Sequence, residues 1–389
     1  ASFFMKNKEV KPTPFIVEAV DDETKARAGT LVVPSGVIPT PVFMPVGTQG
    51  TVKGVIPRDL SATVKASVIL GNTYHLRLRP GHDLIREQGG LGSFMGWNGP
   101  ILTDSGGFQV YSLSKLRRIS DGGVTFQSHL DGTELFLGPR EAIAIQDALR
   151  SDIAMCLDEC PPADAPEKEI AEAVRRTTVW ASQCKDAWLE TAAPDEGRLL
   201  FGIVQGGSFE PVRVRSAEEL VELDLPGYAV GGVSVGESEN EMFDQVAMTT
   251  EQLPHEKPRY VMGVGTPPQM LRMIALGADM FDCVMPSRAA RHGTAFTSTG
   301  RINLKNERFR KDESPLEEGL DCFASMEFSR AYLRHLVATG EMLGPMLLTL
   351  HNLRFFVSLL ERARLHLAKG DFATWSRSWI DRYEAEEGR

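Results

Sequence analysis

The chain has 389 residues, 42% of them hydrophobic, so it is long enough to form one large domain or two smaller ones around an extensive core. Acidic residues outnumber basic ones by 52 to 42, and the formal net charge of -10 excludes a protein that binds polyanions through overall positive charge. Any contact with nucleic acid must therefore come from a local basic patch.

The cysteine content and the N-terminal sequence predict a cytoplasmic protein. Five cysteines, an odd number, are scattered along the chain, which suits a reducing compartment better than a disulfide framework. The sequence has no run of 18 or more apolar residues, and its first residues lack the features of a signal peptide. We therefore expect no association with a membrane, and we expect residues 1–12 to be disordered.

Short apolar runs recur along the chain, and each ends at glycine or a polar residue. The runs are residues 42–46, 67–71, 101–104, 152–158, 199–205, 227–233, 259–264 and 278–285. Continuous hydrophobicity predicts strands buried on both faces, as in a parallel sheet covered by helices. Helical patterns follow the later runs, at residues 139–150, 167–191, 216–223, 238–253 and 267–275. We therefore predict an α/β fold, a closed (β/α)8 TIM barrel, over residues 13–286.

Two segments interrupt the repeat. Residues 106–137 include an alternating pattern around Asp131-Gly132, which predicts a β-hairpin inserted after the third strand. Residues 287–345 form a second insertion after the eighth strand, with seven basic residues between positions 288 and 311. An amphipathic pattern near residues 346–365 opens the C-terminal region, 346–389, whose helices we expect to close the barrel.

Barrel enzymes carry their chemistry where the strands end, and three aspartates lie at such ends: Asp104, Asp158 and Asp282. Buried aspartate is rare unless it is paired, so their convergence indicates a site. Two carboxylates at one mouth suit glycosyl transfer with retention, in which one attacks the anomeric carbon and the other moves protons. Asp282, within an apolar run, is the better candidate nucleophile, and Asp104, before a glycine-rich loop, the better proton carrier.

Other strand ends offer groups that suit a flat base. Asp158, Gln205 and the backbone of residues 231–233 provide hydrogen-bonding groups for the edge of a purine, and Phe108 could stack on its face. Arg288 and Arg291 follow Asp282 closely and suit an anionic substrate. For this last segment alone, a structural aspartate followed by solvated arginines is the alternative interpretation.

Six motifs in the same order resemble those of the tRNA-guanine transglycosylase (queuine tRNA-ribosyltransferase) family, over roughly Phe15 to Tyr383. They are Ile-Leu-Thr-Asp104-Ser-Gly-Gly-Phe-Gln, Asp158-Glu-Cys160, Phe-Gly-Ile-Val-Gln205-Gly-Gly, Gly231-Gly-Val-Ser-Val-Gly-Glu237, Met262-Gly-Val-Gly-Thr and Met-Phe-Asp282-Cys-Val-Met-Pro-Ser-Arg288-Ala-Ala-Arg291. Cys160 and Val235 match the bacterial branch of that family.

The resemblance implies that the wobble guanine of certain tRNAs is exchanged for a 7-deazaguanine base, with 7-aminomethyl-7-deazaguanine preferred, in queuosine biosynthesis. Asp282 would form the covalent ribosyl-enzyme intermediate, and Asp104 would be the general acid/base. The implied base contacts are Ser105, Phe108, Asp158, Cys160, Gln205, Gly232, Val233 and Met262, and the implied tRNA contacts are Arg288 and Arg291. The chemistry needs no cofactor.

The family also carries a structural zinc, held by a Cys-x-Cys-x-x-Cys cluster and a distant histidine. The corresponding residues here are Leu320, Cys322, Ser325 and His351, so Leu320 and Ser325 replace two ligands. Because two ligands cannot close a tetrahedral site, we expect zinc to bind weakly or not at all. We expect apolar packing in its place, by Leu320, Phe323 and Phe328.

Three further residues, Phe328, Tyr332 and His335, resemble positions at the family's two-fold interface and imply a homodimer. The main alternative to an enzyme is a catalytically silent paralogue that binds tRNA as a partner subunit. Loss of zinc ligands fits that alternative, whereas the presence of both Asp104 and Asp282 favours an enzyme. Base exchange in DNA and a barrel enzyme acting on a small sugar are weaker alternatives, the second because it would not need the basic insertion.

Overall fold

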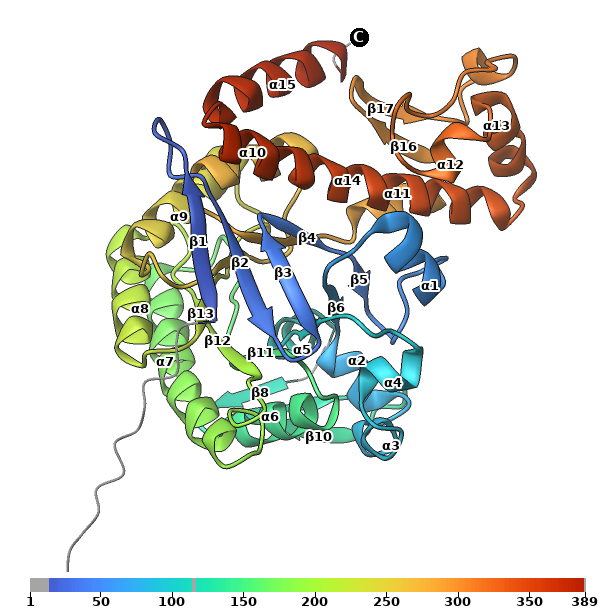
Figure 1. Cartoon of the computed structure of the whole chain (residues 1–389). Coiled ribbons are helices and arrows are strands. Elements are labelled where there is room, and N and C mark those ends of the chain that lie inside the picture. The colour runs from blue at the N-terminus through green and yellow to red at the C-terminus, as the bar shows by residue number, and fades with distance from the viewer. Residues whose placement is uncertain (1–13, 114–116, 388–389) are drawn as a thin grey trace, which may run out of the picture.

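The computed structural model describes residues 14–113 and 117–387 (Figure 1). The segment predicted to be disordered, residues 1–12, lies outside the described residues. At the centre is a parallel sheet with the strand order β4-β15-β14-β13-β12-β11-β7-β6-β5. β4 (Val42–Met44) and β5 (Val46–Gly47) are two halves of one strand; β4 pairs with β15 and β5 pairs with β6, which closes the sheet into a barrel.

All eight predicted strands form. The other seven are β6 (Ile69–Gly71), β7 (Ile101–Thr103), β11 (Ile153–Met155), β12 (Leu199–Val204), β13 (Gly227–Val230), β14 (Arg259–Val261) and β15 (Met280–Asp282). Each is buried almost throughout, since the barrel interior covers one face and helices cover the other. The predicted (β/α)8 barrel is therefore confirmed.

The outer layer consists of helices that follow the strands. They include α1 (Pro57–Asp59), the π-helix η1 (Leu60–Val64), α2 (Thr73–Leu78), α3 (His82–Glu87), α4 (Leu91–Met95), α6 (Pro139–Ala148), α7 (Glu167–Leu189), α8 (Glu210–Glu222), α9 (Glu239–Gln252) and α10 (Pro267–Ala275). α8 begins six residues before the predicted start, because a proline is tolerated in the first turn, where its missing N–H has no helical partner.

A three-stranded antiparallel sheet near the N-terminus was not predicted. It consists of β1 (Phe15–Val20), β2 (Arg27–Val33) and β3 (Gly36–Thr40). Phe15, Leu31 and Ile38 belong to the same buried cluster as the inward-facing barrel residues Leu102 and Phe201. The sheet therefore closes the barrel at the amino-terminal ends of its strands and leaves the opposite end for a site.

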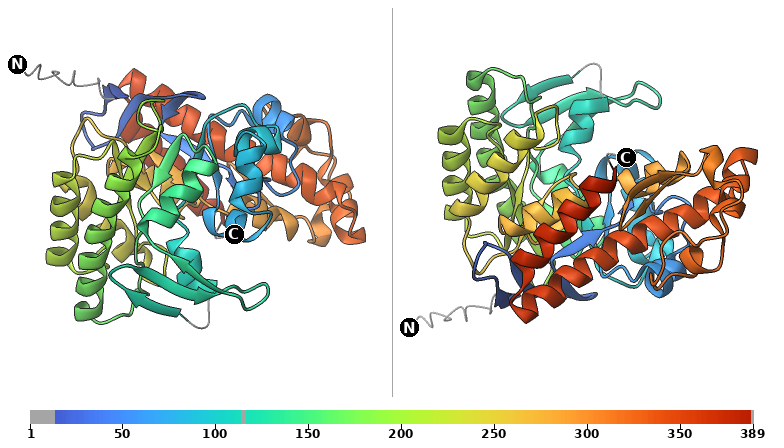
Figure 2. Two further views of the ribbon diagram at one scale, coloured as in Figure 1. Left: turned by 90° about the horizontal axis from the view of Figure 1, so that it is seen from below. Right: turned by 90° about the horizontal axis from the view of Figure 1, so that it is seen from above.

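The chain between β7 and β11 forms α5 (Gly107–Leu113) and an antiparallel sheet of β8 (Arg117–Ser120), β9 (Gly123–Gln127) and β10 (Glu134–Leu137). The alternating pattern around Asp131-Gly132 becomes β9 and β10, which pair from Glu134↔Gln127 to Leu137↔Val124. Figure 2 shows this sheet and the subdomain that follows β15 as separate projections from the barrel.

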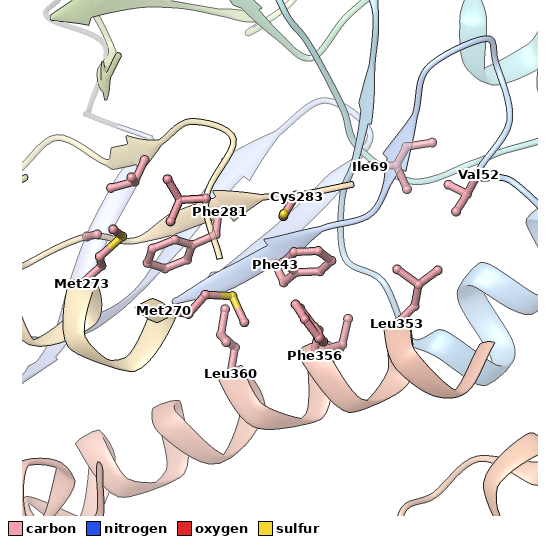
Figure 3. Packing of buried hydrophobic residues seen from close by; sticks show 14 of the residues in the cluster. Phe43, Val52, Ile69, Met270, Met273, Phe281, Cys283, Leu353, Phe356 and Leu360 are labelled. Carbon is pink, nitrogen blue, oxygen red and sulfur yellow. The ribbon is translucent and has the colours of Figure 1, made fainter. Parts of the chain in front are cut away.

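The region after β15 contains α11 (Met285–Arg291), β16 (Thr294–Thr297), β17 (Gly300–Asn303), the 3-10 helix η2 (Glu307–Phe309), α12 (Phe323–Met326), α13 (Arg330–Thr339), α14 (Leu343–Lys369) and α15 (Phe372–Glu387). α14 packs across β4, with Phe356 against Phe43 at 5.1 Å between ring centroids and Leu353 and Leu360 on either side (Figure 3). Although α14 has the length and apolar composition of a membrane span, 78% of its apolar window is buried inside the structure, so it is a core helix.

A buried ion pair joins the N-terminal sheet to the barrel. Arg27 of β2 is 1% exposed and donates two hydrogen bonds to Asp279, which is fully buried immediately before β15; the Nε–Oδ1 and Nη2–Oδ2 distances are 2.9 and 2.6 Å. Asp279 also accepts the amide of Arg259 at 2.7 Å, and Arg27 donates to the carbonyl of Lys257 at 2.7 Å. Every charged atom in the pair thus has a partner, which is the condition under which buried charge is tolerated.

We predict that Arg27→Met lowers the free energy of unfolding by about 3–5 kcal/mol, because it leaves the Asp279 carboxylate buried without its counter-charge. Urea unfolding of the wild type and the variant measures the loss. Arg140→Met is the matched control, since Arg140 makes an equally bidentate pair with Glu190 on the surface and should contribute little. If both variants were equally stable, the buried pair would contribute no more to stability than the surface pair, which would contradict the prediction.

Candidate active site

The carboxyl-terminal ends of the barrel strands bring together the predicted polar residues. Asp104 follows β7, Asp158 lies beyond β11, Gln205 follows β12, Gly232 lies beyond β13, and Asp282 ends β15. The three aspartates and Gln205 have buried or partly buried side chains. One poorly solvated mouth therefore contains three carboxyl groups and an amide.

Asp104 is held by the start of helix α2. Its Oδ1 accepts the amide of Thr73 at 2.8 Å, and its Oδ2 accepts the side-chain amide of Asn72, the N-cap residue of that helix. Burial raises the pKa of Asp104 to about 7; the Thr73 amide opposes the rise, and the charges of Asp282 and Asp158 add to it. Near neutral pH this carboxyl group can therefore both donate and accept a proton.

Asp282 is held on its other side by β14 and the loop after it. Its Oδ1 accepts the Tyr260 hydroxyl at 2.6 Å and the Gly263 amide at 2.7 Å. Burial raises the pKa of Asp282, whereas these two hydrogen bonds lower it. Among the described residues no donor bonds to Oδ2.

Tyr260 connects the two acids electrostatically. Burial raises the pKa of its hydroxyl, and the charges of Asp282 and Asp104 raise it further, so it remains a hydrogen-bond donor. Asp282 in turn raises the pKa of Asp104. The two carboxylates thus interact within the same mouth. Sequence reasoning missed Tyr260, although a tyrosine inside a buried strand signals an unseen partner for its hydroxyl.

Asp158 lies at the centre of a second group. Its Oδ1 accepts the Ser105 hydroxyl at 3.0 Å, and its Oδ2 accepts the side-chain amide of Gln205 at 2.8 Å. Burial raises the pKa of Asp158, and both hydrogen bonds oppose the rise. Burial also raises the pKa of the nearby Cys160 thiol to about 12, so it remains neutral. The predicted base-binding residues Ser105, Asp158, Cys160 and Gln205 therefore form one connected set.

The loop at Gly231-Gly232 lies directly against Gln205. A Cβ at Gly232 would lie 2.5 Å from Gln205 Oε1, and its φ of +65° favours glycine. Arg213 supports this loop and was missed by sequence reasoning. It is fully buried and donates hydrogen bonds to the carbonyl of Gly207 at 2.8 Å and to the carbonyl of Gly231 at 3.2 Å. Its burial lowers the pKa to about 10 without removing its charge at neutral pH. Arg213 thus connects the loop at Gly207 with the loop at Gly231.

The remaining predicted contacts lie around this mouth. Phe108, on α5, is 45% exposed, and Met262 is partly buried just after β14. Val233 is buried beside Gly232. Arg288 and Arg291 are exposed on α11, which begins three residues after Asp282. The placement of Phe108 and Met262 on the two faces of a base remains a prediction.

Two of the residues at the position of the family's zinc site, Ser325 and His351, are hydrogen-bonded to each other. Ser325 Oγ lies 2.6 Å from His351 Nδ1, and His351 Nε2 lies 2.7 Å from the carbonyl oxygen of Phe296. Leu320, Cys322, Ser325 and His351 are all buried. The predicted packing was wrong for Phe323, which is 39% exposed.

Comparison with known proteins identifies the family to which this arrangement belongs. The family model described as queuine tRNA-ribosyltransferase matches residues 21–385. The protein named queuine tRNA-ribosyltransferase from Symbiobacterium thermophilum is 50% identical to this chain, over 94% of this chain and 90% of that protein. The protein of the same name from Pelotomaculum thermopropionicum is also 50% identical, over 96% of this chain and 99% of that protein. The one from Solidesulfovibrio magneticus is 53% identical over 90% of this chain and 93% of its own length. With its two acids at the mouth of a closed barrel, the chain belongs to the queuine tRNA-ribosyltransferase family.

Proposed function

We propose that this protein is a tRNA-guanine transglycosylase that replaces the wobble guanine of tRNA with a 7-deazaguanine base, 7-aminomethyl-7-deazaguanine in preference. The observation that carries the proposal is the pairing of two different carboxyl groups in one buried mouth. Asp104 has a pKa of about 7, which suits proton transfer, and Asp282 has Oδ1 fixed by two donors and Oδ2 left for a ligand.

In the first step, Asp282 Oδ2 attacks C1′ of the nucleotide, and the bond from C1′ to the guanine nitrogen breaks. The electron pair of that bond leaves with the base, which takes a proton from Asp104. In the second step, the ring nitrogen of the incoming base attacks C1′, loses its proton to Asp104, and displaces Asp282. Each step inverts the configuration at C1′, so the product has the original configuration at that carbon. The phosphodiester backbone is not cut. No cofactor is needed.

The base is read, in this proposal, by the group around Asp158. A carboxylate that already accepts from Ser105 and Gln205 still has lone pairs for donors on the edge of a guanine-like ring. The backbone of Gly232 and Val233 supplies amide and carbonyl groups on the other side, and Arg213 fixes the loop that carries them. Phe108 and Met262 would cover the two faces of the ring.

The tRNA backbone would contact the basic side of the same mouth. Arg288 and Arg291 lie on α11, which begins three residues after Asp282, and this supports a role for their positive charge beside the reacting nucleotide. Further exposed basic residues follow in the subdomain, including Lys305, Arg308 and Lys311. This local patch is compatible with the acidic chain as a whole, because binding depends on charge near the site.

We also propose a cytoplasmic homodimer. Phe328 and Tyr332 stack at 5.8 Å between ring centroids, and the exposed side chains of this region include Tyr332, Met342 and Met346. An exposed apolar surface of this kind is typical of an interface.

The five cysteines are free and buried, which suits a reducing compartment. The silent-paralogue alternative is not favoured, because both acids and their hydrogen-bond partners are present.

Replacement of either acid tests their different roles. We expect Asp282→Asn to lower the rate of labelled guanine exchange into tRNA by on the order of 10³-fold or more, and to abolish the covalent tRNA–protein adduct on denaturing gels, because the nucleophile is lost. Asp104→Asn should lower the exchange rate by about 10²- to 10⁴-fold through loss of proton transfer. Asp224→Asn is the control, since Asp224 is exposed at the opposite end of the barrel. An adduct formed by Asp282→Asn would contradict the assignment.

The pH dependence of exchange follows from the two pKa shifts. Asp104 must carry its proton in the first step, so kcat/KM should fall as pH rises above about 7, where this carboxyl group ionises. Asp282 must be ionised, and because burial raises its pKa, the fall on the acidic side should begin above the range of a solvated aspartate. The measurement is kcat/KM for tRNA between pH 4 and 10. A profile that stays flat across pH 7 to 9 would exclude Asp104 as the acid.

A further inference from the structure

The residues at the family's zinc position form a hydrogen-bonded chain instead of a ligand set. Of the four positions, Leu320 offers no donor atom and Ser325 offers only a neutral hydroxyl, so a thiol and an imidazole remain. Within the described residues, no cluster of three or more His, Cys, Asp or Glu side chains is placed to hold an ion. A tetrahedral site of nitrogen and sulfur ligands does not fit this donor set.

The geometry shows which atoms of this hydrogen-bonded chain carry the hydrogens. The Phe296 carbonyl can only accept, so His351 Nε2 carries the hydrogen and donates to it at 2.7 Å. In a neutral ring Nδ1 then accepts, and the Ser325 hydroxyl, 2.6 Å away, donates to it. Both ring nitrogens of His351 are therefore satisfied by the protein, and the lone pair that would bind a metal is already used.

This hydrogen-bonded chain connects the same structural elements that a metal bound at this position would connect. Ser325 lies in α12, His351 lies in the first half of α14, and Phe296 lies in β16. The neighbouring Asn352 completes the connection: its Oδ1 accepts the Phe296 amide at 2.9 Å, and its Nδ2 donates to the Pro286 carbonyl at 2.9 Å in α11. α11 carries Arg288 and Arg291, so the arrangement extends to the proposed tRNA contacts.

Apolar packing surrounds the chain and excludes water from it. Phe355, one turn along α14, stacks on the His351 ring at 6.4 Å between centroids, and Leu320 and Cys322 are buried beside it. In such surroundings a fully paired neutral network is stable, whereas an unpaired polar atom would be costly. Leu320 therefore contributes buried apolar surface at a position where a zinc-binding relative has a cysteine.

We propose that the Ser325–His351–Phe296 hydrogen-bonded chain, with the apolar packing of Leu320 and Phe355, replaces zinc as the brace of this subdomain, so that the protein folds and docks tRNA without a structural metal. Cys322 then contributes to the buried packing of this region and not to a metal site. The inference concerns stability and metal content, and it can fail or succeed independently of the proposed reaction.

The test measures metal content and thermal stability of the full chain produced in zinc-supplemented cells. We expect the wild type to contain far less than one zinc per chain by mass spectrometry, and its Tm to be unchanged by EDTA or by added zinc chloride. Ser325→Ala leaves His351 Nδ1 buried and unpaired, so it should lower the Tm by roughly 1–4 °C, still without sensitivity to EDTA. A wild type that holds one zinc per chain, or that loses stability in EDTA, would overturn the proposal.

A gain-of-metal variant provides the matched comparison. Leu320→Cys combined with Ser325→Cys completes a Cys3His set with Cys322 and His351, so this variant should bind one zinc per chain and become sensitive to EDTA. Adding Cys322→Ala to the double variant should abolish that binding, whereas Cys322→Ala alone should leave the wild-type response to EDTA unchanged. If Cys322→Ala alone removed bound zinc from the protein, the metal-free brace would be refuted.

Discussion

The cost of burying negative charge governs the architecture of this barrel mouth. Three carboxyl groups lie within one poorly solvated space, and desolvation is the largest influence on the pKa of each. Such groups persist in a folded protein only when donors are fixed around them. The helix start at Asn72, the Tyr260 hydroxyl and the Gln205 amide meet this requirement: among the described residues, both oxygens of Asp104 and of Asp158 accept hydrogen bonds, whereas only Oδ1 of Asp282 does.

Different surroundings give the two catalytic candidates different chemistry. Burial and the charges of Asp282 and Asp158 raise the pKa of Asp104 to about 7. Asp282, in contrast, is fixed through one oxygen by the Tyr260 hydroxyl and the Gly263 amide. Environments that separate the behaviour of two like groups are the usual means by which one site performs both acid–base and nucleophilic steps. The donors around Asp282 are neutral, so they orient the carboxylate without a counter-ion that would hold its charge away from a substrate.

Helix α14 connects the site to the subdomain beyond it. Its apolar residues complete the barrel's outer layer against Phe43, and its polar pair His351 and Asn352 binds both backbone groups of Phe296. The same helix is therefore a core element and an anchor for α11 and its arginines. At the other end of the barrel, the buried pair of Arg27 and Asp279 connects the N-terminal sheet to β15, the strand that carries Asp282.

Continuous apolar runs in the sequence were sufficient to predict the eight strands and the closed barrel, because burial on both faces leaves a local pattern that needs no knowledge of partners. The position of each acid after its strand followed from the same pattern. The N-terminal sheet was missed, since its strands are buried on one face only and Ile16, Val32 and Val37 are exposed. Tyr260, Arg213 and the chain from Ser325 to Phe296 could not be predicted, because their partners lie far away in sequence. Hydrogen bonds of this kind exist only once folding has brought distant segments together, and they decide the protonation and orientation on which the chemistry depends.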